Sequence, residues 1–143
     1  MTELPGGLRP YVRRHLRLGW WTLFLFLALG LGLAALRAAQ APCYLHPANA
    51  TRRLMWTLAH THGTLVALLH LVYGAALQLV PRVATAPPRV TSAALTAAGV
   101  ALPGGFFLGG VWFHGGDPGL GILAVPVGAL CLLAAVGGIA RAR

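Results

Sequence analysis

Apolar residues occur in four long runs along the chain, and short polar or proline-rich segments separate these runs. Each run is long enough to cross the hydrocarbon core of a bilayer as a helix, which takes about 20 residues. The pattern therefore predicts an all-α integral membrane four-helix bundle, with residues 1–143 forming a single transmembrane domain. The predicted spans cover about residues 18–36, 54–79, 90–113 and 120–140.

The second run differs from the others because it contains three histidines, His60, His62 and His70. Ionisable side chains are costly inside hydrocarbon, so their presence in a span indicates a functional site. On a helical wheel of about 100° per residue, His70 shares a narrow stripe with small residues that include Gly63. Small residues allow helices to approach closely. We expect Gly63, which lacks a side chain, to leave room for the ring of a cofactor beside the histidines.

The overall composition is typical of a membrane protein, since 57% of the residues are hydrophobic and only 9% are charged. All eleven basic residues are arginines, and they lie at the ends of the predicted spans. An orientation with both termini inside places eight arginines in the cytoplasm and three outside, so the positive-inside rule predicts N-in and C-in. The abundance of Ala, Leu and Gly and the lack of Lys are typical of a GC-rich bacterial genome. We therefore expect a protein of the bacterial inner membrane.

The same charges bear on partners and on catalysis. Arginines at span ends favour anionic lipid over nucleic acid, so the lipid bilayer is the expected partner. The small size favours a homo-oligomer or a place in a larger membrane complex. The two acidic residues, Glu3 and Asp117, cannot supply a paired-carboxylate active site within one chain. No motif of a soluble enzyme is present, and the question of any catalytic activity stays open.

The predicted orientation brings candidate ligands towards the outer side of the bundle, and these are His46, His60, His62, His114 and Asp117. Neutral imidazole binds Zn, Cu and Fe, and haem iron takes axial histidine ligands. We therefore expect a haem or transition-metal site at His60, His62 and His114, with Asp117 and His46 as further metal ligands. His70 lies about 15 Å deeper than His60 and is a candidate for a second level of ligands.

Other interpretations remain open. Each histidine could instead hydrogen-bond to a carbonyl or a threonine of a neighbouring helix, as in a structural or assembly subunit without a cofactor. Pro103, followed by glycines, predicts a kink or an unwound segment, and Pro126 predicts a second kink. Transporters use such broken helices, but transport requires a continuous polar path past Pro103. His15 and His46, considered alone, are expected to face solvent or lipid headgroups.

Two sequence resemblances extend these expectations. The segment AHTHGTLVALLH, residues 59–70, is similar to the histidine-bearing second helix of haem–copper oxidase subunit I, in which a His-Gly segment presents a haem ligand. That resemblance implies that His62, followed by Gly63, is an axial haem ligand. The segments AHTHG, PGGFFLGG and GDPGLGILAVPVGA together resemble a group of small uncharacterised four-span bacterial membrane proteins. This second resemblance covers most of the last three spans and implies a four-span fold.

Overall fold

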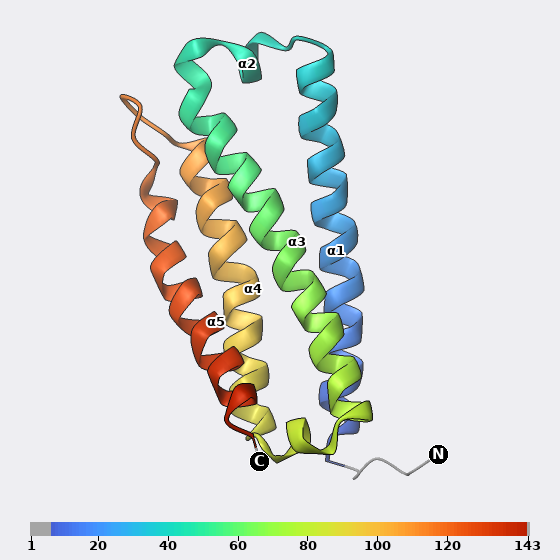
Figure 1. Ribbon diagram of the computed structural model, residues 1–143. Helices are drawn as coiled ribbons and strands as arrows, with labels where there is room; N and C mark the ends of the chain where they lie inside the picture. The colour runs from blue at the N-terminus through green and yellow to red at the C-terminus, as the bar shows by residue number, and fades with distance from the viewer. Residues whose placement is uncertain (1–6, 143) are drawn as a thin grey trace.

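The computed structural model describes residues 7–142, and Figure 1 shows them as long helices side by side, with the first and last of these residues at the same end. Four helices are long and apolar enough to cross a membrane, which confirms the predicted all-α class and the four apolar spans. They are α1 (Arg9–Ala38), α3 (Ala50–Leu79), α4 (Pro88–Val111) and α5 (Ala124–Ala140). Shorter helical turns lie between them: α2 (Pro42–Leu45), η1 (Pro47–Asn49), η2 (Pro81–Thr85) and η3 (Leu120–Leu123).

The first helix begins nine residues before the predicted span, at Arg9 instead of residue 18. Pro10 occupies the first turn of α1, where the missing N–H costs no hydrogen bond because the first helical N–H groups have no intrahelical partner. The residues that follow Pro10 are therefore helical rather than irregular. As a consequence, His15 lies inside a helix that packs against the rest of the protein.

The unwound segment predicted at Pro103 does not form, and Pro126 lies near the start of its helix. α4 continues as an α-helix through Pro103 to Val111, so no unwound segment forms there. Pro126 lies in the first turn of α5, where a proline removes no intrahelical hydrogen bond. The chain before it forms the η3 turn, so the irregular part of the last span precedes Pro126 instead of forming a kink around it.

The helices pack in the order α1, α3, α4, α5, so that α3 contacts α1 on one side and α4 on the other (Figure 1). α1 makes only a small contact with α4. Glycines of η3 and α5 bring these two elements close to the backbone of α4. A Cβ atom on Gly128 would lie 2.7 Å from the backbone N of Leu102, and one on Gly121 would lie 2.8 Å from the N of Gly109.

The connection between α1 and α3 is held by arginines that bind backbone carbonyls. Arg53 donates to the carbonyl oxygens of Tyr44 at 2.9 Å and His46 at 3.0 Å. Arg52 donates to the carbonyl of Gly110 at 3.3 Å, near the end of α4, where helix carbonyls have no intrahelical donor. Two of the three arginines predicted to lie outside are therefore bound within the protein.

Candidate functional site

Two buried polar side chains form a histidine pair between α1 and α3. The Nδ1 atoms of His15 and His70 lie 2.6 Å apart, and the two rings stack with their centroids 4.9 Å apart. The exposed fractions of these side chains are 0% for His15 and 3% for His70. One Nδ1 atom must carry the proton and the other must accept it, because two N–H groups or two lone pairs at this distance would repel each other.

A serine of α4 extends the pair into a chain of three side chains. The Nε2 atom of His15 lies 2.8 Å from the Oγ atom of Ser92, which is fully buried. A neutral imidazole has one N–H group and one acceptor nitrogen, so the position of the proton on His15 fixes the direction of both hydrogen bonds. These three side chains, which we call the His15–His70–Ser92 chain, join α1, α3 and α4, with His15 in the middle bonded to both His70 and Ser92.

The surroundings of this chain are apolar and tightly packed. The ring of Tyr73 meets the ring of His15 edge to face, with centroids 4.8 Å apart, and Tyr73 is only 2% exposed. α1 and α3 approach closely here because Gly19 faces Leu71, whose Cγ would lie 2.6 Å from a Cβ atom on Gly19. The low polarity of such a site strengthens each hydrogen bond and raises the cost of removing one partner.

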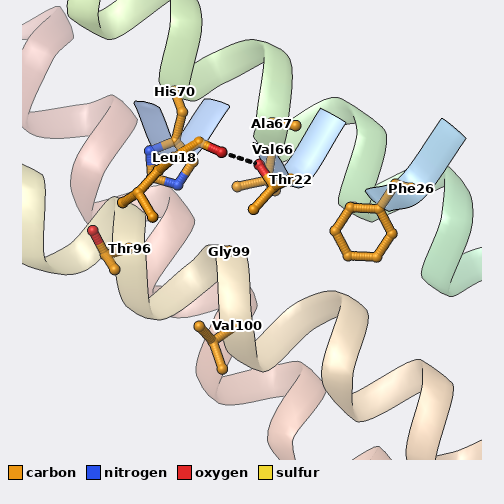
Figure 2. Close-up of a pocket in the computed structure, with 10 residues that line it drawn as sticks. Leu18, Thr22, Phe26, Val66, Ala67, His70, Thr96, Gly99 and Val100 are labelled. Atoms are coloured by element: carbon orange, nitrogen blue, oxygen red, sulfur yellow. Dashed lines mark hydrogen bonds between the residues drawn. The ribbon is translucent and has the colours of Figure 1, made fainter. Parts of the chain in front are cut away.

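The second ring nitrogen of His70 faces a small cavity between α1, α3 and α4. Its Nε2 atom would lie 3.0 Å from a Cβ atom on Gly99, whereas its Nδ1 atom makes the hydrogen bond to His15. The cavity has a volume of about 40 Å³, which is room for a few water molecules. Figure 2 shows His70 at this cavity together with Thr22 and Thr96. A water molecule in the cavity would complete the hydrogen bonding of His70.

His60, one of the predicted cofactor ligands, connects α3 to α1. Its Nδ1 atom donates to the carbonyl oxygen of Phe26 at 2.7 Å, and its ring lies against Gly30, where a Cβ atom would overlap it. The expectation that Gly63 leaves room for a cofactor ring is wrong. The phenyl ring of Phe26 occupies the space beside Gly63, so closely that a Cβ atom on Gly63 would overlap it.

His62 faces α4 and makes its hydrogen bond within its own helix. Its Nδ1 atom donates to the carbonyl oxygen of Leu58, one turn earlier, at 2.9 Å. Its ring lies against the ring of Phe106, with the centroids 4.9 Å apart. His60 and His62 therefore contact different neighbouring helices, in agreement with the divergence of about 160° that two positions separated by one residue have on a helix.

The remaining predicted ligands lie in the connecting loops. His46 is exposed, as predicted, and its Nδ1 atom accepts a hydrogen bond from the backbone N–H of Ala48 at 3.2 Å. His114 and Asp117 are also exposed, and they pair with each other only through backbone atoms. Within the described range there is no group of three or more His, Cys, Asp or Glu residues placed to hold a metal ion. The structure therefore does not assemble the predicted outer ligand set.

His15 is the functional candidate that sequence reasoning missed. The expectation that it faces solvent or headgroups is wrong, because it is fully buried between three helices. A signal was present in the sequence: the buried residues Leu8, Val12, His15 and Gly19 follow one another at intervals of three or four positions. That spacing places them on one face of a helix, provided that the helix begins before the apolar run.

The contact between His60 and Gly30 gives a first testable prediction. Replacing Gly30 with leucine should displace the imidazole from the carbonyl of Phe26 and lower the free energy of unfolding by about 1–3 kcal/mol, the usual cost of overpacking. Gly32 is the matched control, because a Cβ atom there has open space around it. Thermal unfolding in detergent would measure both variants. Equal stability of Gly30→Leu and Gly32→Leu would contradict the contact.

Comparison of the chain with protein-family models, with curated proteins and with solved structures found no match. The function therefore has to be inferred from the geometry of the chain itself. The strongest features are the four apolar helices and the His15–His70–Ser92 chain, which lies between three of them, α1, α3 and α4.

Proposed function

We propose that this chain is a small integral membrane protein of the bacterial inner membrane, with both termini in the cytoplasm, which serves as a structural or assembly subunit of a larger membrane complex or homo-oligomer. The observation that supports this most strongly is the His15–His70–Ser92 chain, which joins three helices through buried side chains. Within a bilayer the hydrophobic effect does not drive helices together, so interhelical hydrogen bonds and close packing hold them.

The other intramembrane histidines support the same role. The Nδ1 atoms of His60 and His62 already donate to carbonyl oxygens, and both rings pack against a neighbouring helix. A metal ion or haem that used these nitrogens would have to displace the hydrogen bonds. The polar groups of α3 thus contribute to the association of the helices.

The outward faces of α1 and α5 support association with other membrane helices. Each of these helices packs mainly against one neighbour, α1 against α3 and α5 against α4. Both expose large apolar side chains, such as Phe24 and Leu31 on α1 and Leu130 and Leu133 on α5. Such faces suit acyl chains or the apolar helices of a partner, and a row of helices that is open at both ends can be extended by further helices.

A transition-metal ion bound by His15 and His70 is a second candidate, favoured by the two facing Nδ1 atoms. Two nitrogen ligands of a tetrahedral zinc ion, each with a Zn–N bond of about 2.0–2.1 Å, lie about 3.3 Å from each other. The two Nδ1 atoms, which now lie 2.6 Å apart, would therefore have to move farther from each other. Haem has less support, because the cavity beside His70 has a volume of only about 40 Å³. Haem or metal binding at His60, His62 and His114 stays a prediction.

Transport has less support than either role. The transport hypothesis requires a continuous polar path past Pro103, but the surface between α1 and α4 at this position is apolar. It is lined by Leu25, Phe26, Pro103 and Phe107 together with small residues. An ion that crossed here would lose its hydration without gaining polar ligands.

The proposed function predicts a colourless, metal-free protein that does not occur as a monomer. The purified chain in mild detergent should show no Soret band and substantially less than one metal ion per chain, and extraction from native membranes should yield an oligomer or a complex. A Soret band that His62→Ala abolishes would support the haem site instead. Stoichiometric metal that is lost in both His15→Leu and His70→Leu would support the metal-bridged pair. A monomer in native extracts would contradict the subunit role.

A further inference from the structure

A groove with a basic inner end runs between α1 and α4. At this end it is lined by Arg13, Arg14 and Arg17 on α1 and by Thr96 on α4, around a space of about 870 Å³. The three arginines are exposed. Asp117 is the only acidic residue in the range 7–142, and it lies in the loop at the opposite end of the helices (Figure 1). Within residues 7–142, the guanidinium groups therefore have no side-chain carboxylate to bind at this end.

The groove continues along the two helices and becomes apolar. The small cavity beside His70 shares Leu18 and Thr96 with the basic end, and it shares Phe26 with an apolar section of about 430 Å³ farther along. Figure 2 shows Leu18 and Thr96 at one end of this cavity and Phe26 at the other. The apolar section also includes Gly104 on α4. The three sections lie next to one another along α1 and α4, because neighbouring sections share lining residues, and together we call them the α1–α4 groove.

The dimensions of the groove match one leaflet of a membrane. Arg17 and Leu29 lie twelve residues apart on α1, which corresponds to about 18 Å at 1.5 Å per residue. One leaflet contributes about 15 Å to the hydrocarbon core of a bilayer. The positive charges therefore lie at headgroup depth, and the apolar section lies at the depth of the acyl chains.

We propose that the α1–α4 groove is a binding site for one anionic phospholipid. The phosphate binds to Arg13, Arg14 and Arg17, and one acyl chain lies along the apolar section as far as Leu29 and Phe107. Guanidinium groups bind phosphate through paired hydrogen bonds, and basic pockets between transmembrane helices are a recurrent type of headgroup site. This inference requires only that the four helices insert into a bilayer, which is one part of the proposed function.

The charge requirement can be tested with delipidated protein in detergent and two lipids that have the same acyl chains, phosphatidylglycerol and phosphatidylcholine. Native mass spectrometry would measure the bound lipid. We expect phosphatidylglycerol to bind at least about 10-fold more tightly, and the triple variant Arg13→Gln, Arg14→Gln, Arg17→Gln to lose this preference. The matched control is Arg82→Gln with Arg89→Gln, because these exposed arginines lie at the same end but line no part of the groove. It should change binding less than about twofold.

The acyl requirement has a separate test at Gly104, where a Cβ atom would meet no other atom within 4 Å. Gly104→Leu should weaken the binding of long-chain phosphatidylglycerol by about 10-fold, since it fills the apolar section, and should leave the fold intact. Inorganic phosphate at millimolar concentration should not displace the lipid. The proposal would be overturned if both lipids bound equally well, or if Arg82→Gln with Arg89→Gln lost the preference for phosphatidylglycerol as fully as the triple variant. Full displacement of the bound lipid by inorganic phosphate would overturn it as well. The oligomeric state of the protein is measured independently, so failure of the lipid site can be distinguished from failure of the subunit role.

Discussion

Replacing Gly128 with leucine should separate α5 from α4 and lower the free energy of unfolding by about 3 kcal/mol or more. A Cβ atom at this position would lie 2.7 Å from the backbone N of Leu102 and 3.1 Å from the carbonyl carbon of Ala101. A flexible side chain could rotate away from such an overlap, but the backbone of a helix cannot. The two helices would have to move apart and lose their closest contact.

Gly137 provides the control for this experiment, because it lies on the same helix and has open space where a Cβ atom would be. The free energy of unfolding of Gly137→Leu should lie within about 0.5–1 kcal/mol of that of the unmodified protein, since leucine also has a higher helix propensity than glycine. Unfolding by graded addition of a denaturing detergent, followed by circular dichroism, would compare the variants. Equal midpoints for Gly128→Leu and Gly137→Leu would show that the α4–α5 contact does not form.

His15→Leu should cost about 1–3 kcal/mol of unfolding free energy, because it leaves Nδ1 of His70 and the hydroxyl of Ser92 without partners in a buried site. His70→Leu should cost a similar amount for the same reason. The double variant should cost less than the sum of the two, since replacing both partners removes the unpaired polar groups together. We expect a coupling energy of about 1–2 kcal/mol, within the range of interhelical hydrogen bonds in membranes.

His46→Ala is the control for the histidine pair, because His46 is exposed and accepts only a local hydrogen bond from Ala48. His46→Ala should change the free energy of unfolding by less than about 0.5 kcal/mol. The same unfolding measurement is made on His15→Leu, His70→Leu, the double variant and His46→Ala. Strictly additive losses for His15→Leu and His70→Leu would contradict direct contact between the two rings.

The sequence predicted the helical class and the four spans because both depend on local properties of the chain. A run of about 20 apolar residues has few alternatives to a membrane helix. The start of α1 was placed too late because its first nine residues contain four arginines, one proline and one histidine, which lower the hydropathy without preventing helix formation. The helix ends at Val111 and at Ala140 lie close to the predicted ends because loop residues follow both.

The candidate site could be predicted only in part. The buried position of His70 follows from its place among small residues on α3, and the structure agrees with it. Its partners could not be predicted in the same way, since His15 lies 55 residues away in the sequence and on a different helix. The contact between Phe26 and Gly63 shows the same limit, because the gap left by a glycine can be filled by a side chain as readily as by a cofactor.

The order in which the His15–His70–Ser92 chain is synthesised has a consequence for biogenesis. His15 leaves the ribosome 55 residues before His70 and 77 residues before Ser92. At about 5–20 residues per second, these intervals correspond to about 3–11 s and about 4–15 s. The imidazole of α1 has neither of its final partners during the first interval and lacks Ser92 until the end of the second. The first helix is therefore complete before it can dock, and its N-terminal end reaches the final position only after translation of α4 has begun.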